Sequence, residues 1–111
     1  MIMENKTITP DKWVVLELKN RIYKVFGSWG GGYLSGDVWK LNSGIKRVEQ
    51  DEDFYYFYGF SGSCYKCRKT NYGVATSYSR AILQTIIDKG AGSVKQLPDV
   101  SYWTHNITNN N

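Results

Sequence analysis

Apolar and polar side chains alternate along several short stretches of the chain, which is the pattern of half-buried β-strands. In residues 13–19, the apolar side chains of Val14 and Leu16 fall on one face. A second stretch follows at residues 22–28, with Asn20-Arg21 between the two. Because Asn tolerates a positive φ, we predict a hairpin whose tight turn places Asn20 in that conformation.

The middle of the chain carries the clearest strand pattern. Segment 54–60 is aromatic at every position except Gly59. Because both faces of this segment carry aromatic rings, we predict a central strand here. Three further strands are predicted at residues 38–42, 45–49 and 63–69, with turns at Ser43-Gly44 and Ser61-Gly62.

A single helix is predicted after these strands. Thr76 or Ser77 can cap its N-terminus, and Gly90 predicts a C′ stop. An apolar stripe at helical spacing suits a helix that covers an open sheet face, and it consists of Tyr78, Ile82, Leu83, Ile86 and Ile87. Beyond the helix, residues 94–97 predict a short edge strand that ends at Pro98.

These elements predict an α+β fold: about six short antiparallel strands, curled into a small sheet or a half-open barrel, packed by one C-terminal helix. At 111 residues the chain has the length of one domain. We expect residues 1–11 to form a flexible lead, residues 12–100 the domain, and residues 101–111 a polar, frayed tail.

Charge is distributed unevenly along the chain. The formal net charge is +4, from fourteen Lys and Arg against ten Asp and Glu. Glu49, Asp51, Glu52 and Asp53 supply four of those acids, and we predict that they form a solvated hairpin end. The remainder is therefore strongly basic, which permits attraction to phosphates or to an acidic protein face.

The apolar segments are too short for a membrane span, which needs about 18 apolar residues. The first residues lack the apolar core of a signal peptide, so we expect a cytoplasmic protein that does not engage a membrane. In that compartment Cys64 and Cys67 are expected to be reduced thiols.

Catalytic and metal-binding signatures are weak. Cys64 and Cys67 are expected to point to opposite faces of a strand, and a structural zinc site needs four ligands. The only histidine, His105, lies in the tail, so no base is placed beside a nucleophile. We expect a protein that is not an enzyme and that binds neither metal nor cofactor.

The glycine-rich segment 28–45 holds five of the eleven glycines and two of the four Trp residues. So many glycines exclude a regular helix. The segment leads into a strand, whereas the phosphate-binding loops of dinucleotide-binding folds and of P-loop proteins lead into a helix. The segment therefore fits neither of these two motifs. Either it is a plain hairpin connection, or it is a slim loop whose backbone a ligand or partner can approach closely.

Two further features permit binding of anions or bases. Ser77, Tyr78 and Ser79 lie at the predicted helix start, where backbone amides favour an anion. Aromatic and basic residues also interleave in segments 55–58 and 65–69. Sheets that stack nucleic-acid bases combine rings and cations in this way, although most of these rings are expected to belong to the core.

Segment 29–45 carries the strings Gly31-Gly32-Tyr33-Leu34, Gly36-Asp37 and Leu41-Asn42-Ser43-Gly44-Ile45, and Gly62-Ser63-x-Tyr65-x-Cys67 and Tyr72-Gly73 follow. In these strings the chain resembles a group of small uncharacterised bacteriophage and prophage proteins. The resemblance covers roughly residues 13–89. It implies a non-enzymatic accessory protein that acts on host enzymes, host defence complexes or the signal nucleotides that such defences make.

Three functions remain open on these grounds. The leading hypothesis is a phage-type counter-defence factor that binds a host protein, with Trp29, Tyr33 and Trp39 as anchors. The alternatives are a protein that sequesters a signal nucleotide and a nucleic-acid-binding protein; self-association is left open. The predicted binding residues are Trp29, Gly31, Gly32, Tyr33, Asp37, Trp39, Asn42, Ser43, Ser63, Tyr65, Arg68, Lys69 and Tyr78.

Overall fold

The structure is a computed structural model that describes residues 6–30 and 39–98. Within these ranges there are eight strands, one short 3₁₀ turn (Lys19–Arg21) and one helix, α1 (Ser77–Lys89). The strands are β1 (Thr7–Ile8), β2 (Lys12–Leu18), β3 (Ile22–Ser28), β4 (Trp39–Leu41), β5 (Ile45–Gln50), β6 (Phe54–Gly59), β7 (Cys64–Arg68) and β8 (Val94–Gln96).

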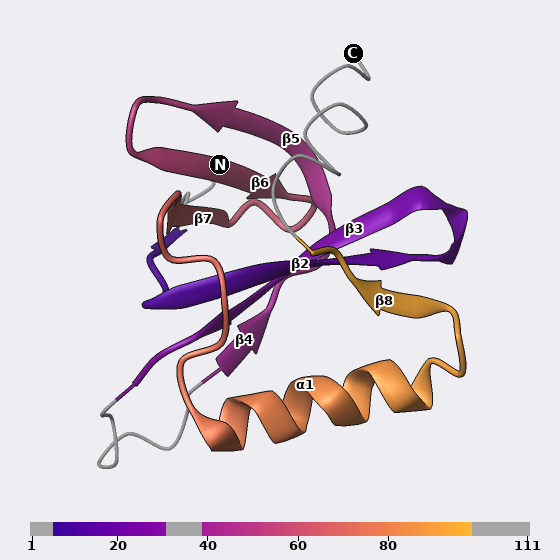
Figure 1. The fold of residues 1–111 in the computed structure, drawn as a ribbon. Coiled ribbons are helices and arrows are strands. Elements are labelled where there is room, and N and C mark those ends of the chain that lie inside the picture. The colour runs from indigo at the N-terminus through magenta and orange to yellow at the C-terminus, as the bar shows by residue number, and fades with distance from the viewer. Residues whose placement is uncertain (1–5, 31–38, 99–111) are drawn as a thin grey trace.

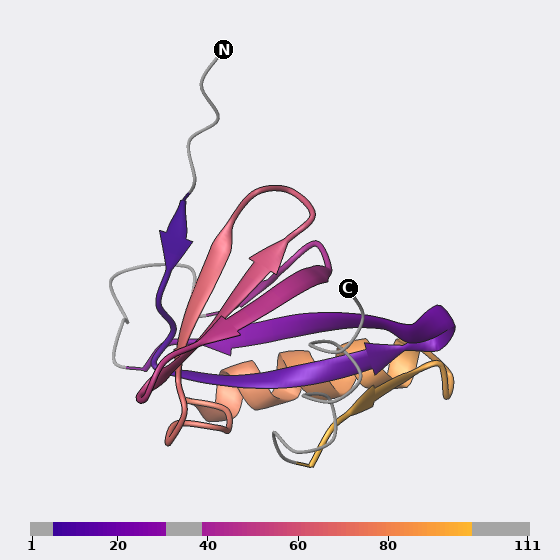
Figure 2. The ribbon, with the colours of Figure 1, turned by 90° about the horizontal axis from the view of Figure 1, so that it is seen from above.

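The elements form three layers (Figures 1 and 2). One sheet has the strand order β4-β3-β2-β8, and the other has the order β1-β7-β6-β5. Helix α1 packs on one face of the first sheet, and the second sheet packs on the opposite face. The predicted α+β class is confirmed, and the helix covers a sheet face as expected. The strands make two sheets, neither of them closed, and β6 lies inside its sheet as predicted.

Alternation along β2 supplies both hydrophobic layers. Trp13 and Val15 face the second sheet and belong to one core cluster, which also contains Phe57. Val14 and Leu16 face the helix and pack with Leu83 in the other cluster. Because strand side chains alternate between faces, a single strand can serve two cores, and β2 is apolar at four consecutive positions for this reason.

The turn between β2 and β3 differs from the prediction. Residues 19–21 form a 3₁₀ turn, and the positive φ of 61° falls on Arg21 rather than Asn20. The register pairs Leu18 with Ile22, so the loop contains three residues instead of two. Three-residue hairpin loops place their last residue in the left-handed region, and here Arg21 holds that position.

Strand β1 was not predicted, since it lies in the segment expected to be a flexible lead. Thr7 and Ile8 pair in parallel with Cys64 and Tyr65 of β7, and Cys64 N donates to the Lys6 carbonyl at 2.8 Å. Two residues are too few for an alternating pattern, so the sequence gives no signal for this strand. At the other end, the predicted edge strand is confirmed as β8, which pairs with β2 alone.

The ends of helix α1 agree with the predicted capping residues, but the conformation at its C-terminus differs from the prediction. Thr76 is the N-cap, and its Oγ1 accepts a hydrogen bond from Ser79 N at 3.0 Å. Gly90 ends the helix, but in a right-handed conformation with φ −72°, and the left-handed residue is Ala91. Gly90 is required for space: an added Cβ would lie 2.6 Å from Val94 Cγ2.

Gly90→Ala is therefore expected to lower the free energy of unfolding by about 1–3 kcal/mol, the usual cost of overpacking. The backbone conformation of Gly90 suits alanine, so the loss would come from the contact with Val94 alone. Urea unfolding measures it, and the cost should shrink when Gly90→Ala is made in a Val94→Ala background. A Gly90→Ala protein as stable as the parent would contradict this account.

Candidate functional site

The face of the second sheet that points away from the core carries a row of aromatic rings. In β6, Tyr55 and Phe57 are buried in the core, whereas Phe54, Tyr56 and Tyr58 alternate with them and are half-buried. Antiparallel pairing sets charged residues of the neighbouring strands directly opposite these rings. We call this surface the outer face, and its residues are Arg47, Glu49, Phe54, Tyr56, Tyr58, Lys66 and Arg68.

Cations lie over the rings at both ends of the row. The Arg47 guanidinium is 4.0 Å from the centre of the Tyr58 ring. Lys66 and Arg68 lie 4.5 Å and 4.6 Å from the centre of the Phe54 ring. Each such contact is worth about 0.5–1 kcal/mol at an exposed site. The long basic side chains are thereby held across the sheet beside the rings.

Two carboxylates fix the tyrosine hydroxyls. Tyr56 OH donates to Asp51 Oδ2 at 2.7 Å, and Tyr58 OH donates to Glu49 Oε1 at 3.2 Å. The hydrogen bond with Tyr56 is the main cause that lowers the pKa of Asp51 below its usual 3.8. The same bond raises the pKa of Tyr56 to about 12. Tyr56 thus keeps its proton at neutral pH, and its ring is held in one orientation.

Acidic residues close one end of the outer face. The β5–β6 turn carries Asp51, Glu52 and Asp53, all of them exposed, as predicted for this acidic run. Asp51 Oδ1 accepts from Asp53 N at 2.9 Å and from Phe54 N at 2.8 Å. The carboxylate of Asp51 therefore builds the turn, and the acidic run has a structural role at the Phe54 end of the row.

Both cysteines are free and buried. Burial raises the pKa of the Cys64 thiol, and it raises the pKa of the Cys67 thiol well above its usual value. Reactive cysteines have a lowered pKa and access to solvent, so the two thiols are packing residues. Over residues 6–30 and 39–98, no cluster of three His, Cys, Asp or Glu side chains could hold a metal ion.

Of the predicted site residues, Gly31, Gly32, Tyr33 and Asp37 lie outside the described residues. Trp29 donates from Nε1 to the Thr9 carbonyl at 3.0 Å. Trp39 stacks on Phe26 with ring centres 5.6 Å apart, and it packs against the cluster under helix α1. Both tryptophans thus have structural contacts within this chain.

Asn42 and Ser43 join the end of β4 to the turns near it. Asn42 is 5% exposed, and its Oδ1 accepts from Val25 N at 2.9 Å and from Gly44 N at 3.2 Å. Its Nδ2 is buried, and no described residue gives it a hydrogen-bond partner. Ser43 Oγ accepts from Ser61 N at 3.0 Å, so the turn after β4 lies against the turn between β6 and β7.

The remaining predicted residues are spread over the molecule. Tyr65 is 3% exposed and belongs to the core, so it presents no ring to a ligand in this structure, and Ser63 is half-buried beside β7. Lys69 donates to Gln50 Oε1 at 2.8 Å. Tyr78 is 58% exposed on α1, in the layer farthest from the outer face. Of the nine predicted residues that the structure describes, Arg68 alone lies on the outer face.

The predictions for the site thus missed most of the outer face. The signal was present in the spacing: Phe54, Tyr56 and Tyr58 are two residues apart, and Arg68 is two residues after Lys66. A period of two puts each set on a single face of its strand. In β6 the residues between them, Tyr55 and Phe57, are aromatic too, so the sequence shows an unbroken aromatic run rather than an alternation.

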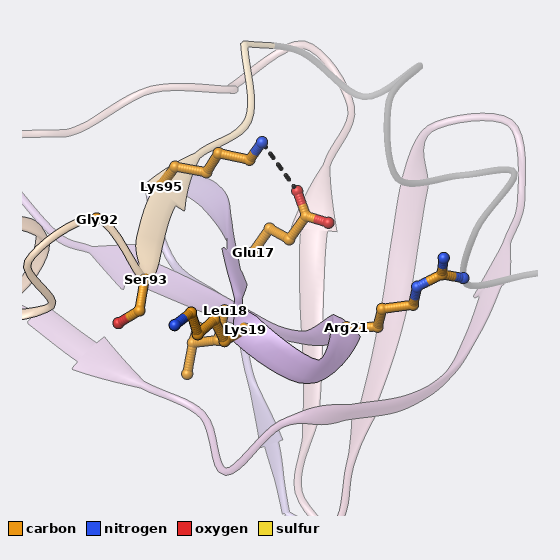
Figure 3. Close-up of a pocket in the computed structure, with 7 residues that line it drawn as sticks. All are labelled: Glu17, Leu18, Lys19, Arg21, Gly92, Ser93 and Lys95. Carbon is orange, nitrogen blue, oxygen red and sulfur yellow. Dashed lines mark ion pairs between the residues drawn. The ribbon is translucent and has the colours of Figure 1, made fainter.

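A separate depression lies between the β2–β3 turn and the loop before β8 (Figure 3). It measures about 270 Å³ and is lined by three basic side chains, those of Lys19, Arg21 and Lys95. Lys95, however, forms an ion pair with Glu17 at 3.6 Å, and Arg21 points away from Lys19. Its basic side chains therefore do not converge on a common point.

Comparison of the chain with family models, with curated proteins and with solved structures finds no match. The resemblance to small phage proteins therefore stays a prediction. Within the described ranges, neither helix α1 nor the 3₁₀ turn combines the length and the apolar character needed to cross a membrane.

Asn42→Ala is expected to lower the free energy of unfolding by about 1–3 kcal/mol, because Val25 N and Gly44 N lose their acceptor inside the protein. Urea unfolding tests this, with Lys40→Ala on the exposed side of β4 as the comparison. The comparison should change stability by less than about 0.5 kcal/mol. Equal stability of the two variants would refute the role given to Asn42.

The lowered pKa of Asp51 predicts an acid dependence of stability. The unfolded chain takes up the proton near pH 3.8, earlier than the folded protein does. The stabilising contribution is thus complete above that pH and is lost as pH falls through the lowered pKa of the folded state. In Asp51→Asn, thermal unfolding should depend less on pH below about 4 than in the parent; parallel profiles would contradict this.

Proposed function

We propose that the protein is a non-enzymatic binding protein whose outer face takes single-stranded nucleic acid. One observation carries the proposal: Phe54, Tyr56 and Tyr58 form a row on one face of a sheet, and basic side chains from both neighbouring strands lie over its ends. Rings that stack bases, flanked by cations that meet phosphates, are how sheet surfaces bind single strands.

The geometry favours a single strand over a duplex. Alternate residues of a strand are about 6.6–6.8 Å apart, a spacing wide enough for one base per ring. Among the described contacts, cations lie over the rings of Phe54 and Tyr58, and the ring of Tyr56 between them has none. Bases in a duplex are stacked on each other and cannot reach such rings. A lone nucleotide would occupy one ring only, so three rings in a row favour a short oligonucleotide.

The charges agree with this occupant. The strands of the outer face carry Arg47, Lys66 and Arg68 against the carboxylate of Glu49, and the carboxylates of the acidic turn lie at its Phe54 end. The chain as a whole is basic. Phosphates dominate affinity for nucleic acids and favour such a balance. The alternative of a host-protein partner depends on residues 29–37, most of which lie outside the described part of the chain, and it stays a prediction.

Tyr56→Ala is expected to weaken binding of a labelled single-stranded oligothymidylate by about 5- to 150-fold, the range that follows from losing one stacked base. Tyr56 is the test residue because its ring has no cation over it among the described contacts. Fluorescence anisotropy at fixed salt measures the affinity. Tyr56→Phe keeps the ring and should bind close to the parent.

Two controls make this test decisive. Tyr78→Ala removes an exposed ring on α1, and it should leave the affinity within about twofold, far below the loss of one stacked base. Lys66→Gln should reduce the slope of log K against log salt by about 0.7, the value for one phosphate contact on a single strand. If Tyr56→Ala and Tyr78→Ala bind alike, the outer face is not the binding surface.

A further inference from the structure

Strand β5 contains a bulge beside the outer face. The register with β6 passes from Ile45 opposite Gly59 to Arg47 opposite Tyr58, so Lys46 is an extra residue. In a regular strand two successive side chains point to opposite faces. Here Lys46 and Arg47 are both exposed. Bulges re-aim side chains in this way next to functional sites.

The two cations line a small depression of about 160 Å³, together with Tyr58, Gly59 and Gly62. It lies where β6 ends, beside the last ring of the row. Gly59 is buried against Ser43 and Gly44, whereas Gly62 has open space where a side chain would be, so a bound group can approach the backbone at Gly62. Gly62 has a φ of 99°, a conformation that favours glycine, and no atom of the described residues lies near its Cβ position. The turn therefore needs glycine for its backbone conformation, and the space beside it holds no atoms of the described chain.

The charge of this depression differs from that of the opposite end of the row. Arg47 lies over Tyr58 and pairs with Glu49, whereas Lys46 has no ion pair among the described residues. The other end of the row adjoins the acidic turn with Asp51, Glu52 and Asp53. At that end the acidic turn offsets the cations Lys66 and Arg68 that lie over Phe54. A doubly charged group at the end of a bound strand is therefore drawn more strongly to the Lys46 end.

We infer that this depression is a subsite for the terminal phosphate of the bound strand. A phosphomonoester carries about 1.5 to 2 negative charges at neutral pH, against one for an internal phosphodiester, and it matches two adjacent cations. The inference rests on the proposed function, because the strand on the rings delivers the phosphate. It adds that the protein distinguishes phosphorylated ends from hydroxyl ends.

The test compares three unlabelled hexathymidylates in competition with one labelled strand: one without terminal phosphate, one with a 5′-phosphate and one with a 3′-phosphate. We expect one phosphorylated form to bind about tenfold or more tightly than the unphosphorylated one, as charge-assisted hydrogen bonds would give. The form that gains affinity identifies the end that lies in the subsite. In Lys46→Gln this ratio should fall towards one.

Lys40→Gln, which removes the same charge from exposed β4 on the other sheet, is the control and should keep the ratio of the parent. An equal fall in both variants would show a general charge effect and overturn the subsite. A ratio of one in the parent, with binding that still depends on Tyr56, would overturn the subsite and leave the proposed function intact. Failure of every strand to bind would overturn the proposed function itself.

Discussion

The packing of Trp13 between the two sheets is the contact on which the rest of the fold depends. Its side chain is fully buried on β2, and its ring lies within 6 Å of the rings of Tyr55, Phe57 and Tyr72. Its Nε1 donates to the Arg68 carbonyl at the end of β7, at 2.7 Å. One side chain thus fills the core between the sheets and satisfies a main-chain acceptor of the opposite sheet.

The proposed binding surface depends on this core. Tyr55 and Phe57 are held inside by Trp13, and the residues between and beside them are therefore forced outward. The same carbonyl of Arg68 that Trp13 binds belongs to a residue whose guanidinium lies over Phe54. The position of the outer rings and cations is thus set from within the sheet, on regular strands rather than on loops, which favours a rigid surface.

The sequence predicted the regular elements because their signals are local. Alternation in β2 and β3, the aromatic run of β6 and the apolar stripe of α1 each lie within a few consecutive residues, and each element appeared within about one or two residues of its expected bounds. What could not be predicted depends on geometry that residue types do not specify. The parallel pairing of Thr7 with Cys64 joins residues far apart in the sequence. The close approach of Gly90 to Val94 and the left-handed conformation of Arg21 depend on the path of the backbone through two tight turns.

The candidate site was harder to predict for a related reason. Trp29 and Trp39 of the glycine-rich segment were predicted as anchors for a partner because they are large aromatic residues. In the structure both make contacts within the chain. Arg68 was predicted as a binding residue because basic and aromatic residues interleave in segment 65–69. The bulge at Lys46 leaves no trace in the pattern of residues, because it is defined by the register with β6. Pairing between strands, more than the character of single residues, decides which side chains meet.

The short strand β1 has a consequence for the solubility of the protein. It is the outermost strand of its sheet, and it pairs with Cys64 and Tyr65 at the start of β7, on the side away from β6. Without residues 6–8, β7 would present its free amides and carbonyls along an open edge, and open edges pair with the edges of other molecules. Residues 6–8 therefore reduce the tendency of this sheet edge to pair with other molecules, although they contribute little to the core.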